Sequence, residues 1–168
     1  RAAPLPLVRE PVFTLDAAAG LEAALLDNGR AKGSLLRGAR VAGGAVEFGS
    51  AGFATFAHRP ELDVPKAFSI ECWVRIDRES RMPVILCCGQ FNQSGWFLQR
   101  YGSGWRWHLA PTNCDGGRPA VGRWTHLVGT YDGSQARLYQ DGKQVAAVVC
   151  QVEPAPAGQP LILGQYAS

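Results

Sequence analysis

The sequence predicts an all-β fold, an antiparallel sandwich of two sheets arranged as a jelly roll. Three observations support this prediction: a hydrophobic period of two along most of the chain, hairpin turns at short intervals, and glycines scattered between apolar segments. Short strands separated by frequent turn signals are typical of sandwiches and jelly rolls. Because 168 residues fit one domain of this kind, we expect residues 1–168 to form a single sandwich domain.

The first third of the chain contains the least regular elements. We expect residues 1–10, which prolines interrupt, to form an extended N-terminal segment. Residues 17–28 are rich in Ala and Leu and predict a short helix at the rim, with a stop at Asn28–Gly29. Residues 39–57 predict two strands around the glycines between positions 49 and 52.

The most regular strand follows immediately, and its two faces differ in character. One face carries Phe68, Ile70, Cys72, Val74 and Ile76, and the other carries Glu71, Trp73 and Arg75. Strict alternation over residues 68–76 indicates a strand with one deeply buried face. We expect Trp73 to be a core residue, because tryptophan in a sandwich is mostly buried.

The remaining strands are marked by turns that contain glycine. Asp132–Gly133 and Asp141–Gly142 are strong hairpin signals, because Asp-Gly tolerates the positive φ angles of tight turns. Gly102–Gly104 joins two more strands as a hairpin loop. The predicted strand regions are residues 83–90, 95–110, 123–149 and 160–164.

Composition and motifs argue against several functional classes. The formal net charge is +3 without any run of Lys or Arg, so we expect no nucleic-acid partner, which would require a basic face. No apolar stretch approaches the roughly 18–20 residues of a membrane span, and no membrane insertion is expected. Glycan cleavage needs two carboxylates about 5–9 Å apart, but Asp77 and Glu79 sit beside arginines at a strand end. No G-x-S-x-G sequence marks a nucleophile, so we expect no enzyme activity.

The five cysteines are an odd number, so at least one cannot pair within the chain. Cys114 and Cys150 lie in or near predicted loops and are the pair we expect to form a disulfide, where geometry allows it. Adjacent Cys87 and Cys88 should point to opposite faces of one strand. Zinc is not expected, because it needs four convergent ligands, usually from close-spaced pairs.

Several segments together resemble the laminin-G-like jelly roll of the concanavalin A-like superfamily. They are FSIECWVRID at 68–77, VILCCG at 84–89, GWFLQ at 95–99, RWTHLVGTYDGSQARLYQDGKQVA at 123–146 and PLILG at 160–164. The resemblance covers roughly residues 10–165, and it implies a concanavalin A-like jelly roll.

Two features depart from the family's pattern. Some relatives hold calcium with an Asp in the loop at residues 47–53, which contains none here. We therefore expect no cofactor, since this loop gives calcium no support. Relatives also continue past the 160–164 strand into a closing strand, and we expect its absence to leave an unpaired sheet edge.

The candidate ligand site lies in an aromatic-rich hairpin and in the segment that follows it. Sugar rings stack on aromatic rings, and polar neighbours can bond their hydroxyl groups. Trp107 is expected in the core, whereas Trp96, Tyr101 and Trp105 fit the core and the surface equally well. Loop 111–118 adds two polar residues that could bind sugar hydroxyls or a metal, although a local role in turns is the favoured interpretation for both. The candidate ligand-binding residues are Trp96, Tyr101, Trp105, Arg106, Asn113 and Asp115.

The resemblance implies a binding role. We expect a non-catalytic, lectin-like carbohydrate-binding module of a secreted or surface protein, at an extracellular, periplasmic or cell-surface location. The alternative is a protein–protein adhesion or assembly module, in which a partner adds a strand to the open edge. The expected partner is thus a glycan or another protein chain or domain. Solvent-facing aromatic residues beside a groove favour the glycan, and an open strand edge favours the protein partner.

Overall fold

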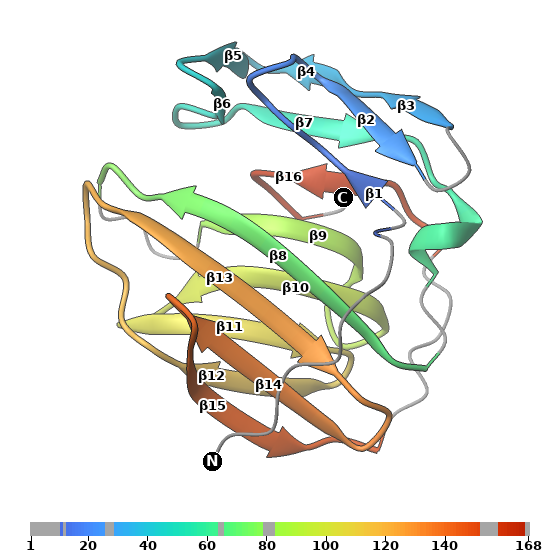
Figure 1. The fold of residues 1–168 in the computed structure, drawn as a ribbon, viewed down its shortest axis with the longest axis vertical. Coiled ribbons are helices and arrows are strands. Elements are labelled where there is room, and N and C mark those ends of the chain that lie inside the picture. The colour runs from blue at the N-terminus through green and yellow to red at the C-terminus, as the bar shows by residue number, and fades with distance from the viewer. Residues whose placement is uncertain are drawn as a thin grey trace.

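A computed structural model of the protein describes residues 11, 13–25, 29–63, 66–78, 83–151 and 158–166 (Figure 1). The segment 1–10, predicted to be extended, lies outside these residues. The described strands form a seven-stranded, a four-stranded, a three-stranded and a two-stranded sheet. No helix in the described part of the chain is long and apolar enough to span a membrane.

The seven-stranded and four-stranded sheets form the sandwich. Across the first sheet the order is β12 (Thr112–Gly116), β11 (Gly104–Leu109), β10 (Ser94–Tyr101), β9 (Val84–Gln90), β16 (Leu161–Leu163), β7 (Phe53–Phe56) and β4 (Ser34–Leu36). Across the second it is β15 (Lys143–Val149), β14 (Gln135–Gln140), β13 (Trp124–Tyr131) and β8 (Phe68–Arg75). All strand pairs among the described residues are antiparallel, which confirms the predicted jelly-roll sandwich.

The first third of the chain adds two small sheets near β7, at the top of Figure 1. They consist of β1 (Phe13–Thr14), β2 (Glu22–Leu25) and β3 (Arg30–Lys32), and of the hairpin β5 (Arg40–Ala42) and β6 (Ala45–Glu47); a 3₁₀ turn, η2 (Pro60–Leu62), follows β7. The predicted helix at 17–28 is wrong, because Glu22–Leu25 is a strand. Ala23 is fully buried between two exposed neighbours, so pairing with β1 and β3 outweighs the local helix preference.

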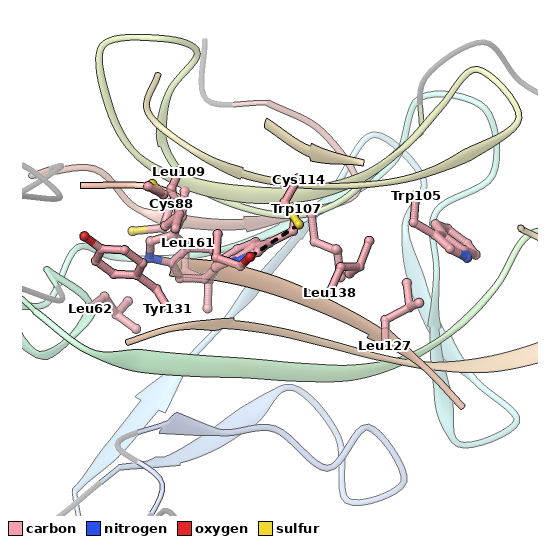
Figure 2. Close-up of a cluster of buried hydrophobic side chains, with 14 of the residues drawn as sticks. Leu62, Cys88, Trp105, Trp107, Leu109, Cys114, Leu127, Tyr131, Leu138 and Leu161 are labelled. Atoms are coloured by element: carbon pink, nitrogen blue, oxygen red, sulfur yellow. Dashed lines mark hydrogen bonds between the residues drawn. The ribbon is translucent and has the colours of Figure 1, made fainter. Parts of the chain in front are cut away.

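The core lies between the two large sheets, and Trp107 is at its centre (Figure 2). Its side chain is 0% exposed, which confirms the predicted core position. The indole N–H donates to the backbone carbonyl of Thr130 at 3.1 Å. Gly129 lies beneath the ring, since a Cβ atom there would be 2.7 Å from an indole carbon. Close packing of this kind ties β11 to β13 across the sandwich.

The cysteines differ from the expected arrangement, because all five are free thiols. The expected disulfide between Cys114 and Cys150 is therefore absent. The Cys114 thiol instead donates a hydrogen bond to the carbonyl oxygen of Ala136 at 3.6 Å. Cys87 and Cys88 lie on opposite faces of β9, as expected, and belong to separate hydrophobic clusters.

Strand β8 forms one end of the four-stranded sheet, and no other described strand pairs with its free edge. Its inward-facing Ile70, Cys72 and Val74 are only partly buried. A cleft of about 2130 Å³ runs along this edge, and Val46, Phe48, Leu86 and Leu163 contribute to its other walls. The described strands therefore leave the sandwich open on the side of β8.

Candidate functional site

The six candidate residues separate onto the two faces of the seven-stranded sheet. Trp105 is 1% exposed and Trp96 is 5% exposed, and both belong to the core between the sheets. The core alternative therefore holds for these two tryptophans, and neither offers an open ring face. Because successive residues of a strand point to opposite faces, Arg106 lies on the outer face, where it meets Tyr101 and Asp115.

Asn113 and Asp115 join this outer face because residues 112–116 form a strand. The sequence suggested a loop here, yet β12 pairs with β11 over its full length. In this register Asp115 lies opposite Arg106, and Asn113 lies opposite His108. Side chains that are directly opposite on one face of a sheet interact with one another. The pairing thus brings together four candidate residues that we call the Tyr101 cluster: Tyr101, Arg106, Asn113 and Asp115.

An ion pair fixes the geometry of the Tyr101 cluster. Nε of Arg106 is 2.7 Å from Oδ1 of Asp115, and a second guanidinium nitrogen is 2.6 Å from Oδ2. The guanidinium carbon also lies 3.6 Å from the centroid of the Tyr101 ring. These hydrogen bonds raise the pKa of Arg106, so the charge beneath the ring is permanent. Tyr101 remains 45% exposed, and the side chain of Asp115 is also 45% exposed.

The buried side chain of His108 contacts the Tyr101 cluster through Asn113. Nδ1 of His108 is 2.7 Å from the side-chain oxygen of Asn113, and the backbone N–H of Asn92 donates to Nε2 at 3.4 Å. Because Nδ1 must donate while Nε2 accepts, this pattern requires the neutral ring. Phe97 stacks on the imidazole with centroids 4.2 Å apart. Burial lowers the pKa of His108 below the ordinary histidine value of 6.5.

We expect His108 to make the stability of the protein fall as pH drops below about 6.5. The unfolded chain takes up a proton in this range before the folded chain does, so protonation favours unfolding until pH passes the lower, folded-state pKa. His108→Phe keeps the ring stacking and removes the titration. Urea unfolding at pH 7.5 and at pH 5.5 measures this effect. Between these two pH values, the free energy of unfolding should fall more for wild type than for His108→Phe. Parallel pH profiles would contradict this role of His108.

Sequence reasoning missed a second set of aromatic side chains, on the outer face of the four-stranded sheet. Trp73 was expected in the core and is 66% exposed, and Trp124 is 47% exposed. Trp73 points outward because it shares its strand face with Glu71 and Arg75, whereas the opposite face is apolar. The two charged neighbours are the signal that could have corrected the expectation for Trp73.

The groups at these surfaces are of kinds that can bind a ligand. The Tyr101 cluster combines an aromatic face with carboxylate and amide groups held in place by neighbours. Within the described ranges, no group of three or more His, Cys, Asp or Glu side chains is placed to hold a metal ion.

Comparison with known families gives a match over most of the chain. The model of a family described as the concanavalin A-like lectin/glucanases superfamily matches residues 48–168. Mouse (Mus musculus) pappalysin-1 is 27% identical over 116 residues, which cover 56% of this chain and 7% of that protein. The chain thus spans a small part of this relative.

Solved structures share the fold at low sequence identity. The binding domain of Paraclostridial Mosquitocidal Protein 1 is similar with a TM-score of 0.70 and 10% identity, over 90% of this chain and 43% of that one. The binding domain of botulinum neurotoxin DC in complex with SialylT has a TM-score of 0.65 and 12% identity, over 91% of this chain and 42% of that one. The chain spans less than half of either structure.

Proposed function

We propose that this chain, which belongs to the laminin-G-like family of the concanavalin A-like lectin/glucanases superfamily, is a non-catalytic carbohydrate-binding module. Its setting would be a secreted or surface protein, at an extracellular, periplasmic or cell-surface location. The family supports a binding role, and the glycan complex of a neurotoxin binding domain with the same fold supports carbohydrate as the ligand class.

The observation that carries this proposal is the convergence of the Tyr101 cluster on one outer face. Arg106 covers one face of the Tyr101 ring and leaves the side chain 45% exposed. A sugar ring can stack on the open face while the half-exposed Asp115 and the exposed Asn113 accept or donate hydrogen bonds to its hydroxyls. Sites of this type use an apolar surface with a few fixed polar groups.

The same contacts argue for binding without catalysis. Glycosidases need one carboxyl group that is free to donate a proton and a second that attacks or activates water. Here both oxygens of Asp115 bond Arg106, and Asp77 bonds Arg75. Arg137 holds the pKa of Asp132 well below its usual range, so that group is also ionised.

A glycan array with and without calcium tests the proposal, using wild type, Tyr101→Ala and Tyr101→Phe. We expect specific signals from wild type, of which Tyr101→Ala loses a subset by at least fivefold. Tyr101→Phe should retain them, because it keeps the stacking ring. Signals that both variants keep would place the glycan site elsewhere. A folded wild-type protein that binds no glycan in either condition would contradict the carbohydrate function.

The open edge of β8 favours a second candidate function, an assembly module that captures an extended peptide of another protein. The cleft beside β8 is lined by partly buried Ile70, Cys72 and Val74, which an added strand with alternating apolar residues would cover. Strand addition supplies backbone hydrogen bonds and pockets for alternate side chains. Hydrogen exchange with peptides selected from a random library should then show protection at residues 68–75, and unprotected amides there would contradict this candidate.

A further inference from the structure

The exposed aromatic residues of the four-stranded sheet form a single surface, here called the Trp73 platform. Its members are Glu71, Trp73 and Arg75 on β8, and Trp124 and His126 on β13. Strands β8 and β13 lie side by side at the front of Figure 1. Their register places Trp73 opposite His126 and Arg75 opposite Trp124. All five residues line the cleft that follows the free edge of β8.

Contacts within the platform hold its rings in place. The rings of Trp73 and His126 are 5.0 Å apart at an angle of 31°, and the guanidinium carbon of Arg75 is 5.4 Å from the Trp124 ring centroid. The backbone N–H of His126 donates to Asp141 at 3.0 Å. Trp73 and Trp124 are diagonal neighbours, which on adjacent antiparallel strands lie about 7–8 Å apart. Two ring faces at this spacing can contact neighbouring sugar units.

The charges around the platform select the kind of ligand. Among the described residues that line the cleft, the carboxylates of Glu47, Glu61, Glu71 and Asp77 outnumber the guanidinium groups of Arg75 and Arg78. The guanidinium of Arg75 is 2.6 Å from Asp77, and Glu71 is 3.8 Å from Nε2 of His126. This excess of negative charge would repel a carboxylate or sulfate group. Exposed aromatic rings with exposed carboxylate acceptors suit uncharged hydroxyl-rich molecules.

We infer that the Trp73 platform is a second ligand site, which binds a neutral oligosaccharide of two or more pyranose units. The inference rests on the carbohydrate-binding function proposed above and adds a site on the opposite face of the sandwich. The C–H face of one sugar stacks on Trp73, and the next unit contacts Trp124. Glu71 accepts hydrogen bonds from the hydroxyl groups, and an exposed tryptophan surface that otherwise faces water becomes covered.

Titration of wild type, Trp73→Ala, Trp124→Ala and Tyr101→Ala with neutral sugars tests this inference. The probes are cellotetraose, maltotetraose and mannotetraose, with sialyllactose as the anionic comparison. We expect at least one neutral probe to bind. Trp73→Ala should weaken the affinity for that probe by at least tenfold, and Trp124→Ala by at least threefold. Binding that is lost in Tyr101→Ala and kept in both tryptophan variants would place the neutral ligand on the Tyr101 cluster and would overturn the platform.

The outcomes also separate this inference from the function on which it rests. An affinity for the neutral probe that stays within twofold of wild type in both tryptophan variants would overturn the platform as a ligand site. Binding of sialyllactose alone would overturn the neutral ligand class and leave a carbohydrate function in place. No binding of any probe, together with an empty glycan array, would overturn both. Because Trp73 and Trp124 are exposed, an unchanged thermal midpoint in each variant shows that the loss concerns the ligand and not the fold.

Discussion

Replacing Trp107 with Ala is expected to lower the free energy of unfolding by about 3–5 kcal/mol. The indole is completely buried and packs against Phe68 and Trp96, with ring centroids 5.7 Å and 6.0 Å away. Its removal leaves a cavity that Gly129, directly beneath the ring, cannot fill. The substitution also leaves the Thr130 carbonyl without the donor that now bonds it, which adds a desolvation penalty.

Urea unfolding followed by circular dichroism measures this loss, and Trp73→Ala is the matched control. The same residue type is removed from the surface, where substitutions usually change stability by about 0.5 kcal/mol or less. Equal losses in the two variants would contradict the placement of Trp107 inside and Trp73 outside the sandwich.

Gly95→Ala is expected to have a similarly large effect, lowering the free energy of unfolding by about 3 kcal/mol or more. Gly95 lies opposite Gly89 in the β9–β10 pair and has a φ of 71°. An alanine there carries strain of about 1–3 kcal/mol. Its Cβ would also collide with the carbonyl oxygen of Cys88, and overpacking of this kind costs about 1–3 kcal/mol more. A backbone atom held in a sheet has little room to move away.

Gly102→Ala separates the two causes, because only the first applies to it. Gly102 has a φ of 56°, and a Cβ atom there would have no neighbour within 4 Å. We expect a loss near the lower end of the strain range, about 1 kcal/mol. The two alanine variants should therefore differ clearly in thermal midpoint. Indistinguishable midpoints would show that the collision at Gly95 relaxes without cost.

The strands of the sandwich could be predicted because their signals are local. The alternation in residues 68–76 and the two Asp-Gly turns depend only on neighbours in the chain, and β8 and the β13–β14–β15 hairpins follow them closely. By contrast, residues 22–25 carry a helical composition but form a strand, because β1 and β3 supply partners that the local sequence does not reveal.

The candidate site was predictable in part for the same reason. Periodicity shows which residues share a face but not which face is inside. Trp105 and Trp73 both lie on strands that also carry charged residues, yet the first is buried and the second exposed. The difference lies in the companions on each face: Trp105 aligns with Trp107 and Leu109, and Trp73 aligns with Glu71 and Arg75. Arg106 contacts Asp115 because residues 112–116 form strand β12 beside β11. The turn-rich composition of residues 111–118 predicted a loop instead.

The free thiols have a consequence for chemical reactivity. Cys87, Cys88, Cys114 and Cys150 are all buried, and burial raises the pKa of Cys88 to about 12 and that of Cys114 to about 11. Only the thiolate is nucleophilic, so alkylating reagents and oxidants meet almost no reactive sulfur at these four positions while the fold is intact. With a reagent that reacts faster than the core closes again, modification at these positions would proceed at the rate at which the sheets separate. The rate at which these buried thiols are modified therefore reports on the opening of the core.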